Sequence, residues 1–280
     1  MIELADSSVD LMVTSPPYPM IKMWDNQFSI LNPKIPKLWK KLEKTGKEEY
    51  LDKIFQIMHD SLSNTWRETF RVLVDGGIAC INIGDATRKI NGAFRLFSNH
   101  SKIIEYCEKI GFTTLPYILW KKPTTKPQYR GKNIFLGSGF LPPNAYVTLD
   151  CEFILIFRKG KLRKFQPKDK LRYESSFTKK QRNEWFSQIW TIKGIRQKIS
   201  QVERKIAAFP EEIVSRLIRM FSIKFDTILD PFLGSGTTIK IAMKHQRNSV
   251  GYEIDKTLLP LFNEKVIGNQ KSIKLQIINR

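Results

Sequence analysis

Two short motifs carry the residue types that could do chemistry in this chain of 280 residues. The first joins a hydroxyl, two prolines and an aromatic ring, and consists of Ser15, Pro16, Pro17 and Tyr18. Proline fixes φ and donates no hydrogen bond, so the pair ends the preceding strand in one defined direction. We predict that Ser15 and Tyr18 are held rigidly beyond a strand end, where open parallel sheets bind ligands. A structural turn with a packed tyrosine is the alternative interpretation of this motif alone.

The second motif is a strand end followed by a glycine turn and a helix start. It consists of Asp230, Pro231, Phe232, Gly234, Ser235, Gly236, Thr237 and Thr238. Glycines at such a turn let a ligand approach the backbone closely. No lysine follows them, so the turn is not a Walker phosphate loop, and its acid favours a cationic or uncharged ligand. With Glu253 at the end of the next strand, placed to accept ribose hydroxyls, the pattern predicts a nucleoside pocket.

Alternating strands and helices must position both motifs. Apolar runs predict strands over residues 9–14, 78–83, 112–120, 152–157, 227–229 and 250–254. Helical periodicity predicts helices over 51–73, 94–110, 209–223 and 237–245, and a final helix. We expect residues 75–77 to end the first helix, residues 121–148 to be a loop and residues 159–200 to form a separate small substructure. The pattern predicts an α/β fold with a mostly parallel, doubly wound sheet.

The charge is concentrated in two windows. Lysine and arginine number 47 against 27 acids, a net charge of +20, and residues 121–135 and 158–182 carry +5 and +9 of it. Such concentration favours a polyanion-binding surface over a solvated charged face. The candidate nucleic-acid contacts are Lys122, Lys126, Arg130, Arg163, Lys164, Lys168, Lys170 and Arg172.

Other classes of protein have less support. The chain has three cysteines and three histidines, scattered without metal-ligand spacing, so we predict no metal site. Cys80, Cys107 and Cys151 sit among apolar residues and are interpreted as small buried side chains in a reducing cytosol. No apolar run reaches membrane-span length and no signal peptide is visible, which predicts a cytoplasmic protein without membrane association.

The two motifs, with "AFPEEIV" at 208–214, resemble the amino-methyltransferases of DNA. The catalytic motif precedes the glycine turn, which resembles the circularly permuted beta group and its cytosine-N4 methyltransferases of restriction–modification systems. The resemblance implies a Rossmann-like, S-adenosylmethionine-dependent methyltransferase fold with a seven-stranded sheet. It also implies that residues 230–238 and Glu253 bind S-adenosylmethionine, with Phe209 and Pro210 beside its methionine and adenosine moieties.

The resemblance implies a role for each residue of the first motif. The Ser15 side chain and the Pro16 carbonyl accept hydrogen bonds from the target amine, and Pro17 helps to fix both. Tyr18 stacks on a base flipped out of the duplex, and the methyl group passes directly to nitrogen. Serine at position 15 is the family's usual mark of cytosine N4, with adenine N6 as the alternative. An RNA methyltransferase that stacks bases on Trp185, Phe186 and Trp190, and an inactive nucleic-acid-binding relative, also stay open.

The resemblance also divides the chain into parts. Residues 1–158 are expected to form the catalytic half, 159–205 a target-recognition insert and 206–280 the cofactor-binding half. Relatives usually have a strand and an acidic turn before the equivalent of residues 2–10, and either that strand is missing here or residues 272–280 supply it. Double-stranded DNA is the expected partner of a monomer or homodimer in the prokaryotic cytoplasm, at the nucleoid. A cognate restriction endonuclease acting on the same site is a further candidate partner.

Overall fold

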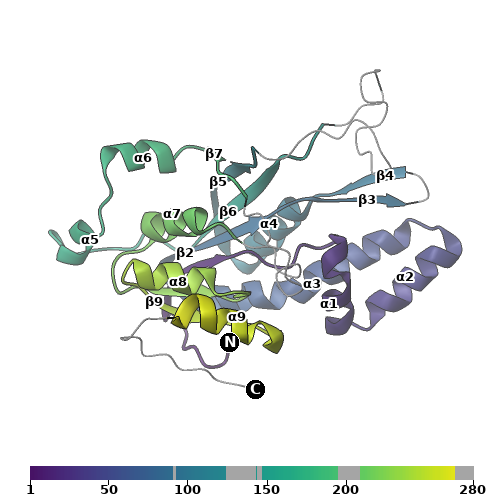
Figure 1. The fold of residues 1–280 in the computed structure, drawn as a ribbon, viewed down its shortest axis with the longest axis horizontal. Coiled ribbons are helices and arrows are strands. Elements are labelled where there is room, and N and C mark those ends of the chain that lie inside the picture. The colour runs from purple at the N-terminus through teal and green to yellow at the C-terminus, as the bar shows by residue number, and fades with distance from the viewer. Residues whose placement is uncertain (91–92, 124–142, 144–146, 195–208, 269–280) are drawn as a thin grey trace.

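A seven-stranded sheet forms the centre of the molecule (Figure 1). The structure is a computed structural model that describes residues 1–90, 93–123, 143, 147–194 and 209–268. The strand order is β7-β5-β6-β2-β1-β8-β9, in which β6 is antiparallel to both neighbours and the other pairs are parallel. The strands are β1 Val9–Thr14, β2 Leu73–Ile83, β5 Phe112–Lys121, β6 Cys151–Lys159, β7 Ile189–Thr191, β8 Thr227–Asp230 and β9 Asn248–Gly251. The predicted mostly parallel α/β sheet is therefore confirmed.

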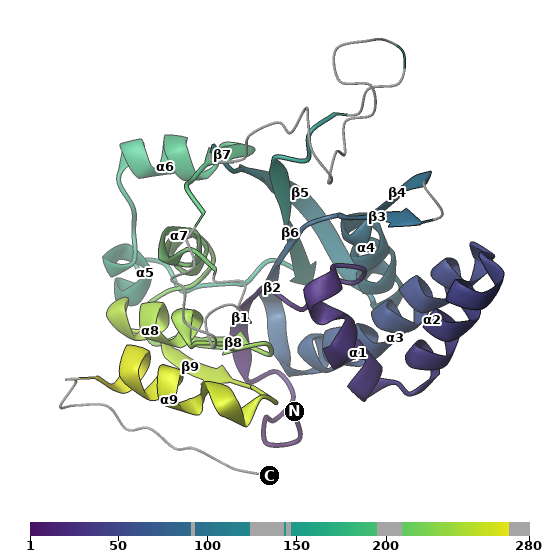
Figure 2. The ribbon, with the colours of Figure 1, turned by 45° about the vertical axis from the view of Figure 1, so that its right-hand side comes forward.

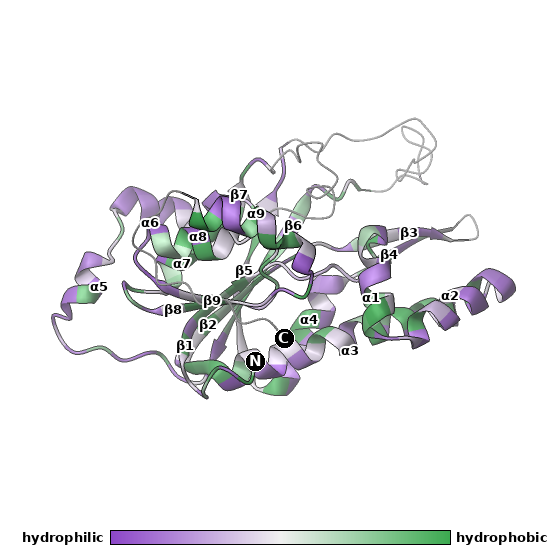
Figure 3. Ribbon diagram, turned by 60° about the horizontal axis from the view of Figure 1, so that its bottom comes forward, coloured by the Kyte–Doolittle hydropathy of each residue, from purple (hydrophilic) through white to green (hydrophobic). Residues whose placement is uncertain are grey.

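Helices cover both faces of this sheet, as Figure 2 shows. The helices are α1 Asp25–Leu31, α2 Lys34–Thr45, α3 Glu49–Val72, α4 Asn99–Ile110, α5 Lys170–Glu174, α6 Lys179–Trp185, α7 Glu211–Phe221, α8 Thr237–Lys244 and α9 Leu259–Phe262. Side chains alternate along a strand, so Met12 of β1 packs into the core under α3 and α4, while Leu11 and Val13 pack into the core under α7 and α8. The central strands are accordingly hydrophobic along their length (Figure 3).

Two predicted boundaries are wrong. Helix α3 ends at Val72 and β2 begins at Leu73, so residues 75–77 lie inside a strand. They form an irregularity in the pairing of β1 with β2, and Gly76 supplies the positive φ of +80° that it needs. Helix α4 begins at Asn99, because residues 93–97 form β4, which pairs with β3 (Ala86–Ile90) as a hairpin. A short apolar run such as 94–97 does not distinguish helix from strand by periodicity.

The segment after β6 is not a separate substructure. Its last described strand, β7, pairs with β5 and becomes the edge of the main sheet. Trp185 and Trp190 are buried in the core that α7 covers. Two indole rings need apolar partners, and the highly basic segment 159–200 offers few of its own. Whether residues 159–205 recognise the target remains a prediction.

The same ranges bear on several smaller expectations. Cys80 and Cys107 are buried, but Cys151, at the first residue of β6, is partly exposed. Residues 272–280 lie outside the described residues, as does most of the predicted loop 121–148. Within the described ranges, no helix is long and apolar enough to cross a membrane, and no cluster of metal-ligating side chains occurs.

Candidate functional site

The first motif leaves the sheet at its centre. Strand β1 lies between β2 and β8, and all three end at the same edge, called here the carboxyl edge. Ser15 follows the last residue of β1, and Pro16 is buried while Ser15 and Tyr18 stay partly exposed. This is the ligand-binding edge of an open α/β sheet. The prediction that the proline pair places both side chains beyond a strand end is confirmed.

The hydroxyl of Tyr18 is the centre of a hydrogen-bond network. It donates to Glu152 Oε2 at 2.9 Å, accepts from Asn82 Nδ2 at 2.7 Å and lies 3.2 Å from the Ser15 hydroxyl. Asn82 Nδ2 also lies 2.8 Å from the same carboxylate oxygen. Burial, and then the Glu152 charge, raise the pKa of Tyr18 well above its ordinary value of 10, so the phenol stays protonated.

The network fixes the direction of the Ser15 hydroxyl. Tyr18 has a single hydroxyl proton, and it donates this proton in its hydrogen bond to the carboxylate of Glu152. The hydrogen bond between Ser15 and Tyr18 must then use the proton of Ser15. The lone pairs of Ser15 Oγ are thereby left for a ligand, which makes this serine a hydrogen-bond acceptor at the open edge of the sheet.

Glu152 reaches the network because β6 runs antiparallel. Its register with β2 and β5 brings the start of β6 to the carboxyl edge, where β5 ends at Lys121. The next residue, Lys122, forms an ion pair with Glu152, and its ammonium lies 4.6 Å from the ring centroid of Trp120. Lys122 was a predicted nucleic-acid contact, but the structure pairs it with the network around Tyr18.

A second group of side chains supports the loop after Tyr18. Asn99, the first residue of α4, donates to the carbonyls of Pro19 at 3.0 Å and Gly84 at 2.9 Å. His59 of α3 contacts Asn99 at 3.1 Å, and burial lowers the pKa of this imidazole to about 4, so it is neutral. Arg88 of the hairpin donates to the Met20 carbonyl at 2.7 Å. Asn99 and Arg88 therefore hold the loop directly, and His59 supports it through Asn99.

Asp230 links the two motifs. Its Oδ1 accepts from the Thr14 hydroxyl at 2.6 Å and the Phe232 amide at 3.1 Å, and its Oδ2 accepts from the Thr238 hydroxyl at 2.6 Å. Burial outweighs these hydrogen bonds and raises the pKa of Asp230 to about 6. The acid expected to face a ligand instead ties the end of β1 to the first turn of α8. We call Thr14, Asp230 and Thr238 the aspartate clamp.

The glycine turn has the predicted strand–turn–helix geometry. Glu253 lies two residues beyond β9, not at its end as predicted, and its exposed carboxylate accepts from the Gly234 amide at 2.8 Å. Gly236 has a φ of +85°, and a Cβ atom there would lie 2.5 Å from Val266 and 2.7 Å from Phe262. Glycine at this position is thus required by packing against the C-terminal helix, whereas the sequence pattern predicts that close approach of a ligand requires it.

The remaining residues of the predicted pocket flank this turn. Phe209 and Pro210 are buried just before α7, and the Phe232 ring contacts Trp66 of α3 with centroids 6.0 Å apart. Pro231 and Ser235 are buried, and Thr237 is partly exposed at the start of α8. All of them lie at or next to the carboxyl edge, on the β8 side of Ser15.

The basic residues of the second window lie at the other end of the sheet. Arg163 donates to Asp226 at 2.6 Å and lies 3.1 Å from Asp10, residues at the start of β8 and β1. At about 3.3 Å per residue, that position is roughly 15 Å from Ser15. Arg163 is thus part of an ion-pair cluster, which does not fit its predicted nucleic-acid role.

The other predicted contacts divide into two groups. Lys164, Lys168, Lys170 and Arg172 are exposed in the segment leading into α5 and within it, at the end of the molecule far from the loop that follows β1 (Figure 1). Their contact with nucleic acid remains a prediction. Lys126 and Arg130 lie outside the described residues.

Four residues of this site were missed by sequence reasoning. They are Thr14, Asn82, Asn99 and Glu152. All but Asn99 occur next to or within an apolar run, where a polar side chain has to find a partner when buried. That signal was present in the sequence. It does not say which partner each side chain finds.

Comparison with known proteins agrees with this geometry. A family model described as DNA methylase matches residues 9–264. The chain belongs to this DNA methylase family. A relative from Methanocaldococcus jannaschii, the type II methyltransferase M.MjaI, is 62% identical over 100% of this chain and 93% of its own length. The type II methyltransferase M.MthZI from Methanothermobacter thermautotrophicus is 45% identical over 95% of this chain and 73% of its own.

Solved structures place the fold in the same family. TTHA0409 from Thermus thermophilus, a putative DNA modification methylase in complex with S-adenosylmethionine, has a TM-score of 0.74 at 28% identity, covering 99% of this chain and 95% of its own. The PvuII cytosine-N4-specific DNA methyltransferase has a TM-score of 0.60 at 17% identity, covering 96% and 89%, which supports the fold alone.

This DNA methylase is of the restriction–modification type, and its family takes the methyl group from S-adenosylmethionine. The predicted family, fold and cofactor are confirmed. The base that it methylates is not decided by the family, which includes both cytosine-N4 and adenine-N6 enzymes.

Proposed function

We propose that this methylase modifies the exocyclic N4 of cytosine within a specific sequence of duplex DNA. The observation that carries the proposal is the Ser15 hydroxyl, which Tyr18 and Glu152 orient as an acceptor at the carboxyl edge. The choice of cytosine over adenine rests on serine at this position, which is the usual mark of cytosine N4 in the family.

The target nitrogen is a poor nucleophile, because its lone pair is delocalised into the base. Two acceptors on its N–H groups favour the pyramidal form that attacks, and the candidates are Ser15 Oγ and the carbonyl of Pro16. The proline pair fixes the carbonyl, and the Tyr18 network fixes the hydroxyl. Acceptors that are already oriented do not need to reorganise during the reaction, which lowers the barrier.

Tyr18 is proposed to stack on the flipped base. An enzyme that reacts with a base atom inside a duplex has to extrude that base first. The hydroxyl anchor to Glu152 and Asn82 restricts the Tyr18 ring to one position. A fixed ring loses less entropy when the base stacks on it, so the anchor contributes to both capture and alignment.

The glycine turn fits the methyl donor. Glu253 is exposed and carries a carboxylate that can accept ribose hydroxyls, with Gly234 beside it in a left-handed conformation. Phe232 is partly exposed and offers apolar surface for the adenine ring, and Phe209 and Pro210 are buried at the same edge of the sheet. When bound, S-adenosylmethionine supplies an electrophilic methyl group on a sulfonium. The aspartate clamp then holds the donor turn next to Ser15, through the bond between Thr14 and Asp230.

The alternatives are less well supported. Adenine N6 would use the same acceptors and is the second candidate. An RNA methyltransferase would stack bases on Trp185, Phe186 and Trp190, but both tryptophans are buried and only Phe186 is exposed. An inactive binding protein has no need of an oriented serine. A restriction endonuclease of the same specificity is the proposed second partner.

Product analysis tests the choice of base. Duplex DNA is methylated with labelled S-adenosylmethionine, digested to nucleosides and analysed by mass spectrometry. We expect N4-methylcytosine. N6-methyladenine would overturn the choice of base and keep the mechanism, whereas 5-methylcytosine would contradict the mechanism itself.

A further inference from the structure

Helix α2 presents a row of lysines that the catalytic site does not use. Residues 34–44 include five lysines against one acid, Glu43. The lysines are Lys34, Lys37, Lys40, Lys41 and Lys44, and all five are exposed. Successive lysines are one or three residues apart, while Ile35 and Leu42 are buried on the opposite side. The helix therefore packs with an apolar side and leaves a cationic side to solvent.

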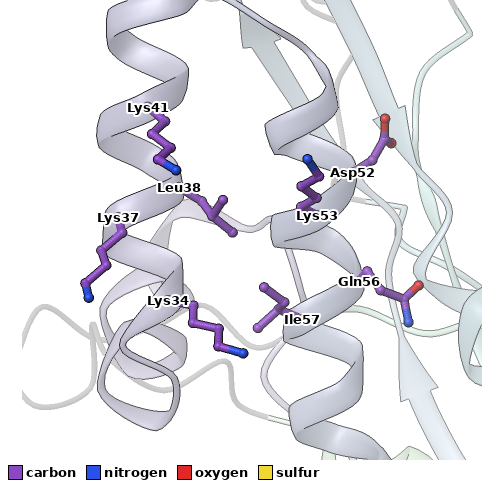
Figure 4. A pocket seen from close by; sticks show the side chains of 8 residues that line it. All are labelled: Lys34, Lys37, Leu38, Lys41, Asp52, Lys53, Gln56 and Ile57. Atoms are coloured by element: carbon purple, nitrogen blue, oxygen red, sulfur yellow. The ribbon is translucent and has the colours of Figure 1, made fainter.

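This cationic side borders a groove between α2 and α3, with a volume of about 620 Å³ (Figure 4). Its lining residues are Lys34, Lys37, Leu38, Lys41, Asp52, Lys53, Gln56 and Ile57. The one acid among them, Asp52, forms an ion pair with Arg95 of the hairpin. In the part of the chain that the structure describes, none of the α2 lysines has a carboxylate partner within 4.0 Å. We call Lys34, Lys37, Lys41 and Lys53 the groove lysines.

The groove lies at the same end of the molecule as the loop of Ser15 and Tyr18. Figure 1 shows α1, α2 and the β3–β4 hairpin beyond the carboxyl edge, and α5 at the opposite end. Contacts connect the groove to the loop: Gln56 is three residues from His59, which contacts Asn99, which donates to the Pro19 carbonyl. Three residues of helix are about 5 Å along the α3 axis.

The row of lysines is long enough to contact several consecutive phosphates of one DNA strand. From Lys34 to Lys44 the helix rises about 15 Å at 1.5 Å per residue. One strand of B-DNA advances 3.4 Å per phosphate, so this length corresponds to roughly four phosphates. Lysine is a flexible point charge suited to phosphate contacts that carry no sequence information.

We propose that the groove lysines and the exposed side of α2 bind the phosphate backbone of duplex DNA that flanks the target base. The proposal rests on the proposed function in one respect, namely that duplex DNA is the substrate. It assigns the nonspecific part of DNA affinity to α2, and not to the more basic segment 158–182, whose described cations lie at the far end of the sheet.

Two triple variants with the same change in charge test the proposal. One is Lys34→Gln, Lys37→Gln and Lys41→Gln, and the control is Lys164→Gln, Lys168→Gln and Lys170→Gln. All six lysines are exposed, so both variants are expected to fold as wild type does. DNA affinity is measured by fluorescence anisotropy on a duplex that the wild type methylates, at several salt concentrations.

The α2 variant is expected to flatten the slope of log K against log salt by two to three units, because each phosphate that is no longer neutralised accounts for about 0.9 units. Its affinity near 0.1 M salt should fall by about 100-fold, and the single-turnover rate at saturating DNA should stay at the wild-type value. The control variant should leave both the salt slope and the DNA affinity close to their wild-type values. Equal slopes for the α2 variant and wild type, or a weakening confined to the control, would overturn the proposal. A wild-type protein that methylates no duplex DNA would instead remove the proposed function.

Discussion

Removing one oxygen atom, in Tyr18→Phe, separates the hydrogen-bond network from the stacking ring. By sequence alone this substitution is expected to be mild, because the ring remains. The structure changes that expectation, since the hydroxyl contacts Ser15, Asn82 and Glu152. Without it, Ser15 loses the partner that orients its proton, and the hydroxyl turns freely between donor and acceptor orientations.

The size of the effect follows from the hydrogen bonds that the substitution removes. The neutral bond to Ser15 is worth about 1 kcal/mol, and the bond to the Glu152 carboxylate about 1.5–3 kcal/mol. Water partly replaces the phenol in this partly exposed site, so we expect the barrier to methyl transfer to rise by about 2 kcal/mol. That increase slows the single-turnover rate by about 30-fold.

Single-turnover transfer of labelled methyl groups to saturating DNA measures this rate. Tyr117→Phe is the matched control, because Tyr117 also lies at this sheet and contacts Phe153, while its hydroxyl makes no hydrogen bond among the described residues. A fluorescent base analogue at the target position should report normal flipping in Tyr18→Phe and impaired flipping in Tyr18→Ala. A wild-type rate in Tyr18→Phe would refute the idea that the network orients Ser15.

Four further outcomes are expected. Ser15→Ala should slow transfer by about 100-fold and leave cofactor affinity unchanged in calorimetry, and full activity would contradict the acceptor role. Glu253→Gln should weaken S-adenosylmethionine binding by about 10- to 100-fold in the same assay, and equal affinity would remove Glu253 from the pocket. Gly236→Ala should lower the unfolding midpoint because the new Cβ meets Phe262, and an unchanged midpoint would show that the helix yields. The raised pKa of Asp230, about 6, means that its folded state binds a proton more tightly than the unfolded chain does. Its contribution to stability is therefore complete below about pH 4 and is lost as pH rises through about 6, by about 3 kcal/mol. Urea unfolding of wild type and Asp230→Asn across this range should show that difference, and parallel curves would contradict it.

Much of the site was predictable because its residues end strands. Ser15, Asp230 and Glu253 follow apolar runs, and parallel strands bring their ends to one edge whatever their order in the chain. The glycine turn was predictable for a similar reason, since a left-handed residue is needed where a strand turns into a helix.

The partners of these residues were not predictable. Glu152 begins an apolar strand, and only the antiparallel direction of β6 brings it to Tyr18. The two basic windows did not predict the contacts of all their residues correctly for a related reason. The number of basic residues does not show whether each side chain faces a ligand or a carboxylate of the protein. Arg163 belongs to the most basic window and yet forms ion pairs with two aspartates.

The pairing of β1 with β8 has a consequence for the synthesis of this protein. Leu11 lies opposite Ile228, 217 residues later in the chain. Ribosomes add about 5–20 residues per second, so the edge of β1 waits about 10–40 s for its partner. During that time a buried strand of the finished sheet exposes unpaired amides and the side chains of Leu11 and Val13 to other chains. The centre of this fold thus closes late in synthesis, and until then the nascent protein is open to chaperones and to aggregation at the strand that leads into the loop of Ser15 and Tyr18.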